Sequence, residues 1–262
     1  MLVLGYFLSI LIGVSLGLMG GGGSILTVPL LVYFFDVDPL LATSYSLFIV
    51  GFTSLIGIPP YIRDRNINRQ LVLSFGIPSV LAVFSTTYFL VPILPEKFEF
   101  STIVLKRDFI LLLFFSLILI VSSFSMVGKK NLEIKETPFS SLKLLITGLV
   151  TGCLTGIIGI GGGFLIVPAL VKASKIPIKK AIGTSLLIIV MNAFIGLLAM
   201  RDYSKLDFEL LISILFFALL GMILGVRLAR KIDGNTLKVF FGWFILILAI
   251  LILVSEMCKV FY

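Results

Sequence analysis

Long apolar stretches follow one another along the whole chain, and they constrain the fold more than any other feature of the sequence. Six of them have about the 17–25 residues that cross a bilayer as a helix. These six are 40–61, 71–94, 109–127, 178–200, 208–226 and 237–254. Only 13% of the residues are charged, against about 25% in soluble domains. The sequence therefore predicts an all-α polytopic membrane protein.

Two further apolar stretches, 2–35 and 142–171, are too long for one straight crossing, and glycines interrupt both. Shifting the chain against itself by 139 residues aligns 13–57 with 152–196 without a gap, and 16 of the 45 positions are identical. The identities cluster on glycine, proline and serine, whereas chance agreement between apolar helices would fall on leucine and isoleucine. We conclude that the chain is an internal duplication.

The distribution of lysine and arginine indicates how the two halves are oriented. If 2–35 and 142–171 each cross the membrane once, the 21 basic residues divide 10 to 11 between the two sides. If each stretch instead turns at its glycines and returns to the side it came from, the division becomes 15 to 6. The second arrangement follows the positive-inside rule. It leaves three full crossings per half, an odd number, so the halves are inverted.

We therefore predict two inverted-topology repeats, residues 1–127 and 141–262, joined by a cytoplasmic connector at 128–140. Each repeat consists of a re-entrant, glycine-broken helical hairpin and three transmembrane helices. The net charge of +8 then reflects cytoplasmic loops, and we expect the lipid bilayer rather than nucleic acid as a partner. The sequence leaves open whether the chain forms an oligomer.

The glycine runs lie at 20–24 and 159–163. Non-helical backbone at membrane depth is tolerated only where it is buried in protein or lines an aqueous cavity. The apolar run after each glycine run reaches only about halfway across a bilayer. We predict two half-helices that begin near the midplane, whose N–H groups and positive dipole ends face each other and bind an anion.

Close packing of helices is the alternative role for these glycines. It suits the spaced pairs Gly13/Gly17 and Gly152/Gly156, whereas packing alone rarely needs three or four consecutive glycines. The helix after each hairpin also carries polar residues at matched positions, and their hydroxyls or amide could donate to an oxyanion. Alternatively, the hydroxyls bond carbonyls of their own helix. The predicted substrate-binding residues are Gly22, Gly23, Ser24, Ser46, Gly161, Gly162, Gly163, Thr184, Ser185 and Asn192.

The absence of histidine excludes histidine-based catalytic triads and histidine-ligated zinc or haem. Cys153 and Cys258 form neither a disulfide framework nor a CxxC motif. Glu209, the second residue of 208–226, is the only acidic residue within the six predicted crossings. The rest of their length carries no acid, which disfavours an intramembrane enzyme, a cation site and a carboxylate for proton coupling. We therefore expect no metal, no cofactor and no enzymatic activity, and an anion flux that is electrogenic without obligatory proton coupling.

Three segments resemble the TauE/SafE family of membrane transporters, also called the sulfonate uptake permease family. They are 20–29 (GGGGSILTVP), 159–168 (GIGGGFLIVP) and 181–186 (AIGTSL). The resemblance implies transport of a sulfur-containing anion, such as sulfite or an organosulfonate, across a prokaryotic plasma membrane. The first half departs from the pattern, because Tyr45 stands at the position of Thr184. A different small anion, such as a carboxylate, and a passive anion channel are the alternatives.

Overall fold

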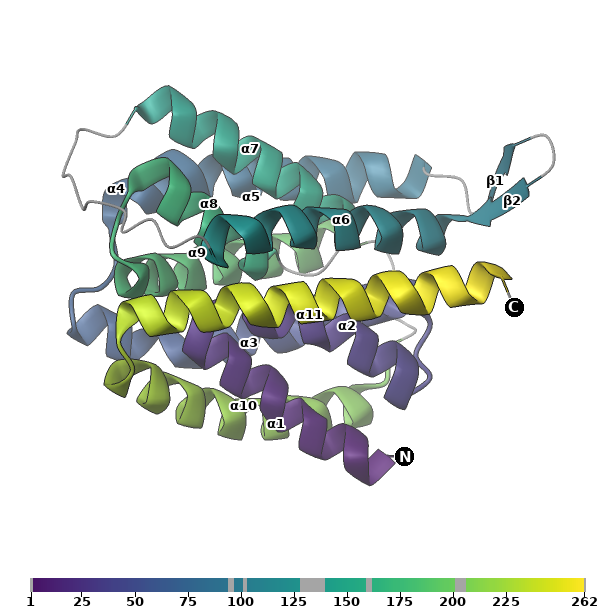
Figure 1. The fold of residues 1–262 in the computed structure, drawn as a ribbon, viewed down its shortest axis with the longest axis horizontal. Coiled ribbons are helices and arrows are strands. Elements are labelled where there is room, and N and C mark those ends of the chain that lie inside the picture. The colour runs from purple at the N-terminus through teal and green to yellow at the C-terminus, as the bar shows by residue number, and fades with distance from the viewer. Residues whose placement is uncertain are drawn as a thin grey trace.

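The structure is a computed structural model that describes residues 2–93, 97–100, 103–127, 140–158, 162–200 and 206–261. Apart from a short β-hairpin, the regular elements of this part of the chain are helices (Figure 1). In the first half they are α1 (Leu2–Met19), α2 (Gly22–Phe34), α3 (Pro39–Arg63), α4 (Arg69–Leu71), α5 (Ile77–Ser85) and α6 (Arg107–Val127). In the second half they are α7 (Ser141–Ile158), α8 (Gly163–Ser174), α9 (Ile178–Ala199), α10 (Phe208–Lys231) and α11 (Gly234–Phe261).

The helix that contains α4 and α5 is irregular. Two π-helical segments, Val72–Gly76 and Thr86–Leu90, flank α5, and a 3₁₀ turn follows at Val91–Ile93. The sequence did not predict the two strands that come next, β1 (Lys97–Phe100) and β2 (Ile103–Lys106). They pair antiparallel, with Lys97 opposite Lys106 and Phe100 opposite Ile103.

Five helices of the described part are long and apolar enough to cross a membrane. They span Leu41–Arg63, Arg69–Ile93, Ile178–Ala199, Phe208–Lys231 and Val239–Cys258. Shorter apolar helices lie at Leu4–Met19, Gly23–Phe34, Ser141–Ile157 and Gly163–Ser174, where the sequence has its two glycine-broken stretches. The protein is therefore a multi-pass helical membrane protein.

The ends of α2 and α8 have matching backbone geometry. Asp36, just after α2, and Lys175, just after α8, both adopt left-handed conformations, with φ of 54° and 52°. These residues are 139 positions apart, the offset found in the sequence. In Figure 1 the start of α1 and the end of α2 lie toward the right, whereas the start of α7 and the end of α8 lie toward the left.

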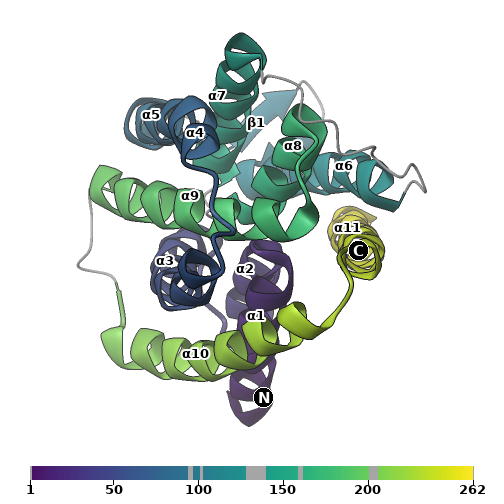
Figure 2. The same cartoon turned by 90° about the vertical axis from the view of Figure 1, so that its left-hand side faces the viewer.

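The packing order of the helices also follows the offset. Along one row, α7 contacts α5, α5 contacts α9, α9 contacts α3, α3 contacts α10 and α10 contacts α1 (Figure 2). The central pair, α3 and α9, are equivalent helices of the two halves, and so are the outer pair, α1 and α7. The helices α6 and α11 pack against each other beside this row. The main interfaces therefore join one half of the chain to the other.

Glycines bring the outer helices of the row into backbone contact. A Cβ on Gly13 of α1 would lie 1.8 Å from the Ala218 carbonyl oxygen of α10, and a Cβ on Gly152 of α7 would lie 2.3 Å from the Ser79 carbonyl oxygen of α5. Ser79 and Ala218 are 139 residues apart. The packing role considered for Gly13 and Gly152 is therefore present, and the correspondence extends well beyond residue 57.

Candidate functional site

The two glycine turns meet inside the molecule. Helix α1 ends at Met19, Gly20 takes a left-handed conformation with φ of 65°, and α2 begins at Gly22. In the second half, Gly162 has φ of 66° and α8 begins directly after it. A Cβ on Gly21 would lie 2.1 Å from the carbonyl carbon of Gly163. The backbones at the starts of α2 and α8 are thus in contact, as neighbours of one site.

The residues that precede α2 and α8, Gly21 and Gly162, provide no side-chain hydrogen bond to the first turn of either helix. Helix N-termini carry N–H groups without intrahelical partners and the positive end of the helix dipole. The starts of α2 and α8 are in contact and have no capping side chain at Gly21 or Gly162. Their backbone N–H groups and dipoles therefore make this region locally positive without a lysine or arginine side chain. This region favours an anion.

One face of α9 runs past both turns. Ser185 donates from Oγ to the Gly20 carbonyl at 2.7 Å, and also to the carbonyl of Ile182 at 2.8 Å. One helical turn later, the Cδ1 atom of Ile189 would lie 2.6 Å from a Cβ on Gly163. Asn192 follows at the helical spacing that keeps it on this face. The structure thus brings Ser185 and Asn192 onto the helix face that contacts the glycine turns.

Three buried polar atoms of the described residues have no hydrogen-bond partner: Ser46 Oγ, Ser54 Oγ and Asn192 Oδ1. All three residues are fully buried. A buried polar atom without a partner costs about 1–3 kcal/mol. The two serine hydroxyls could donate to an oxyanion, whereas the Asn192 Oδ1 atom can only accept, so Asn192 would reach an oxyanion through its amide N–H groups. Two of these residues, Ser46 and Asn192, are among those predicted from the sequence.

Other predicted site residues use their polar groups within the protein. Thr184 donates to the Lys180 carbonyl at 2.7 Å and accepts from the Asn68 backbone N–H at 3.0 Å. Ser24 donates from Oγ to the Gly21 carbonyl at 2.7 Å. These two hydroxyls hold the surrounding backbone in place. For Thr184, its bond to the Lys180 carbonyl is the alternative raised from the sequence.

The predicted glycines occupy different surroundings. A Cβ on Gly23 would lie 2.2 Å from the Ile12 carbonyl oxygen of α1, and a Cβ on Gly162 would lie 1.9 Å from Thr155 Oγ1 of α7. Close packing within each hairpin therefore requires these two glycines. Gly22 is the first residue of α2 and Gly163 the first of α8, whereas Gly161 lies outside the described residues.

Tyr45 and Thr184 have equivalent roles despite their different side chains. Tyr45 Oη accepts from the Asp207 backbone N–H at 2.6 Å, as Thr184 Oγ1 accepts from that of Asn68. Asn68 and Asp207 are 139 residues apart, and each caps the helix that follows it. The exchange of Thr for Tyr therefore conserves a contact to the loop before the next helix.

Sequence reasoning missed Ser79 of α5. Its hydroxyl accepts from Asn192 Nδ2 at 3.0 Å, and Ser79 is fully buried. The available signal was a serine inside an apolar helix at the position where the other half has Ala218.

Apart from Glu209, the sequence placed no acid within the predicted crossings, and the structure contradicts this at Glu256. Helix α11 continues to Phe261, and its apolar span, Val239–Cys258, includes Glu256, whose side chain is only 3% exposed. The error arose because the predicted crossing ended at Val254. Tyr33 of α2 donates to the Glu256 carboxylate at 3.2 Å.

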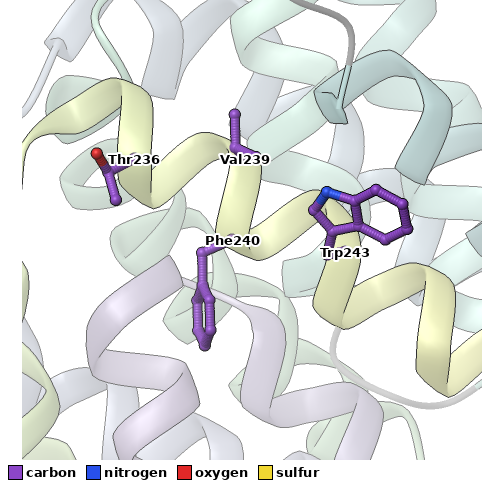
Figure 3. Close-up of a pocket in the computed structure, with 4 residues that line it drawn as sticks. All are labelled: Thr236, Val239, Phe240 and Trp243. Atoms are coloured by element: carbon purple, nitrogen blue, oxygen red, sulfur yellow. The ribbon is translucent and has the colours of Figure 1, made fainter.

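A surface hollow on α11 is lined by Thr236, Val239, Phe240 and Trp243 (Figure 3). Phe240 and Trp243 are about half exposed, and exposed aromatic residues are common where membrane helices meet the lipid headgroup region. These mostly apolar side chains suit an acyl chain better than an oxyanion. Among the described residues, no group of three or more His, Cys, Asp or Glu side chains could hold a metal ion.

Comparison with known proteins agrees with the membrane fold. A family model described as "Sulfite exporter TauE/SafE" matches residues 6–252. A "Probable membrane transporter protein" from Xylella fastidiosa is 28% identical over 250 residues, covering 93% of this chain and 91% of the relative. A relative with the same description from Methanocaldococcus jannaschii is 29% identical over 201 residues, covering 73% and 71% of the two chains.

The relative YdhB of Bacillus subtilis, also described as a probable membrane transporter protein, is 26% identical over 228 residues, which cover 87% of this chain and 90% of YdhB. No solved structure matches the chain. Because the family match extends over nearly the whole sequence, this protein belongs to the TauE/SafE family of membrane transporters.

Proposed function

We propose that this protein carries a small sulfur-containing anion, such as sulfite or an organosulfonate, across the plasma membrane of a prokaryote. The anion binds near the midplane, where α2 and α8 begin. The observation that carries the proposal is the backbone contact between Gly21 and Gly163, which brings two helix N-termini together. The description of the family as a sulfite exporter supports sulfite and related anions as the ligand class.

The buried polar groups fit an anion of this kind. Hydroxyls predominate among the buried polar residues of the described chain, with one amide, Asn192, and one acid, Glu256. Hydroxyl, amide and backbone N–H groups can donate to sulfite or sulfonate oxygens without the cost of burying a cation. A site built from neutral donors also permits release, since the ligand leaves no unpaired buried charge behind.

The proposed fold consists of two inverted repeats, residues 1–127 and 141–262, with a cytoplasmic connector at 128–140. In each repeat, α1–α2 or α7–α8 forms a hairpin that enters the membrane and returns to the same side. Two observations support this arrangement: the matching left-handed residues Asp36 and Lys175, and the exchange of equivalent helices along the packing row. Opposed half-helices at the midplane are a known transporter plan.

Uptake into proteoliposomes tests the proposed function. Labelled sulfite, organosulfonates, sulfate and carboxylates are supplied in turn, and the initial rate is measured against concentration. We expect saturable uptake of sulfite or a sulfonate, with carboxylates and sulfate competing weakly. Saturable uptake of a carboxylate alone would assign a different anion, and a rate that never saturates would indicate a passive channel; either result contradicts the proposal.

A further inference from the structure

We infer that Asn192 of α9 binds the anion directly, to one side of the pseudo-two-fold axis, and that Ser79 of α5 positions the Asn192 amide. This inference rests on the proposed function, because it assigns the residues that set affinity at the same site. The comparison of the two halves of the chain provides the argument.

The position of Asn192 is fixed by its neighbours on α9. Ser185 and Ile189 contact the turns at Gly20 and Gly163, and Asn192 lies about 4.5 Å further along the helix axis at 1.5 Å per residue. It is fully buried. A ligand at the start of α8 is therefore within reach of this amide.

The hydrogen bonds of Asn192 are only partly used inside the protein. The amide offers two N–H donors and one carbonyl acceptor. Nδ2 donates to Ser79 Oγ at 3.0 Å, and Oδ1 has no partner among the described residues. The bond to Ser79 fixes the plane of the amide, and an oxyanion that accepts from the remaining N–H would complete the donor side of this group.

The other half of the chain lacks this pair. The residue equivalent to Asn192 is Thr53 of α3, and the residue equivalent to Ser79 is Ala218 of α10. Thr53 donates instead to the Ile49 carbonyl of its own helix at 2.5 Å, and alanine has no hydroxyl to orient a neighbour. The polar contact therefore exists on the α5–α9 side and not at the equivalent position on the α3–α10 side.

The backbone differs between the halves at the same place. The π-helical segments Val72–Gly76 and Thr86–Leu90 lie on either side of Ser79, whereas the equivalent helix α10 is a continuous α-helix from Phe208 to Lys231. Insertions of π-helical turns are frequent at functional sites. The two halves thus differ in the backbone around Ser79 as well as in the side chains of Ser79 and Asn192.

The test exchanges each residue for its equivalent from the other half. Sulfite and methanesulfonate are the probes, and KM and Vmax are measured in proteoliposomes. We expect Asn192→Thr to raise KM at least about tenfold, which corresponds to about 1.4 kcal/mol of lost binding free energy. The matched control Thr53→Ala should leave KM within about twofold of wild type, since its hydroxyl already bonds its own helix.

A double-mutant cycle tests the positioning role of Ser79. Ser79→Ala should raise KM about threefold in the wild-type background and add nothing in the Asn192→Thr background, because Ser79 acts through Asn192. A purely structural effect of Ser79 would appear in both backgrounds and would contradict its positioning role. KM does not depend on the amount of active protein, so partial loss of folded protein does not obscure the result.

The same experiment separates this inference from the proposed function. If the wild-type protein transports neither probe, the assignment of sulfite and sulfonates is wrong. If the wild type transports either probe and Asn192→Thr leaves KM unchanged, or Thr53→Ala raises KM equally, then the ligand is not held on the α5–α9 side and this inference is wrong.

Discussion

The glycines of the two turns are chemically identical, but they have different structural roles. Gly23 and Gly162 are equivalent by the 139-residue offset, and each packs against the preceding helix of its own hairpin. Gly21 and Gly163 instead contact each other across the two halves. The first pair shapes each hairpin, and the second pair sets how closely the starts of the two half-helices approach each other.

Replacement of Gly162 by alanine should destabilise the protein. A left-handed φ costs a residue with a Cβ about 1–2 kcal/mol, and the new Cβ would lie 1.9 Å from Thr155 Oγ1. Thermal unfolding of the purified protein in detergent measures the loss. Gly51→Ala is the control, because only the Ala193 Cβ lies near, at 3.0 Å. Equal melting temperatures for the two variants would show that the turn relaxes to accept a side chain.

Ser46 and Ser185 are equivalent in sequence, but their removal should have different effects. Ser185→Ala breaks the bond to the Gly20 carbonyl and should reduce the free energy of unfolding by about 1 kcal/mol. Ser46 Oγ has no hydrogen-bond partner among the described residues, so Ser46→Ala should leave stability unchanged. It should weaken anion binding by about 1.5–3 kcal/mol, the value of a hydrogen bond to a charged ligand. Measuring melting temperature and KM for both variants checks this, and unaltered KM in Ser46→Ala would contradict it.

Among the helices, the sequence could predict where apolar helices lie and where they break, because an apolar run in a bilayer has few alternatives to a helix. It did not predict where α11 ends, since the apolar pattern stops at Val254 while the helix continues to Phe261. The halves of the duplication and the glycine interruptions at α1–α2 and α7–α8 followed from the same pattern. The pairing of Asn192 with Ser79 could not be predicted. A helix that is apolar on most sides gives little indication of which face meets a neighbour, so the contact between α9 and α5 required the three-dimensional structure.

The Asp207 side chain caps the N-terminus of α10, and we predict that this cap stabilises the helix. Asp207 Oδ1 accepts from the backbone N–H groups of Glu209 and Leu210, at 2.9 and 3.1 Å. Asp207→Ala should reduce the free energy of unfolding by about 1 kcal/mol, within the usual range for loss of an N-cap. Asp207→Asn retains a capping oxygen and should melt close to wild type. If both variants melt alike, the cap does not stabilise the helix.

For the molecule as a whole, membrane orientation depends on the proposed inversion of the two hairpins. The loop at Asp36–Asp38 should lie outside the cell and the loop at Lys172–Lys180 inside. Single cysteines introduced as Asp38→Cys and Lys175→Cys, in a background without Cys153 and Cys258, should react with an impermeant thiol reagent from opposite sides of intact cells. Labelling of both from one side would exclude inverted repeats.

The driving force of transport is also a property of the whole molecule. The buried carboxyl group of Glu256 raises the question of whether protons are coupled to anion flux. A monovalent anion gains about 2.3 kcal/mol per 100 mV when it leaves an inside-negative cell, so voltage alone can drive export. We predict that flux in proteoliposomes follows an imposed potassium-diffusion potential and ignores a pH step, and that Glu256→Gln behaves in the same way. A flux that follows the pH step in the wild type and loses this response in Glu256→Gln would identify Glu256 as a proton carrier.

The glycine contacts between α1 and α10 have a consequence for synthesis of the chain. The backbone of α1 at Gly13 and Gly17 fits against residues 218–226, which leave the ribosome long after α1 has entered the membrane. Until then the face of α1 that carries Gly13 and Gly17 lacks its contact with α10. In the same way, α5 lacks its contact with Gly152 and Gly156 until α7 has been synthesised. Assembly of the two halves therefore has to be completed inside the bilayer after both have been inserted. A chain that stops after α6 would leave both glycine-lined interfaces open to other membrane proteins.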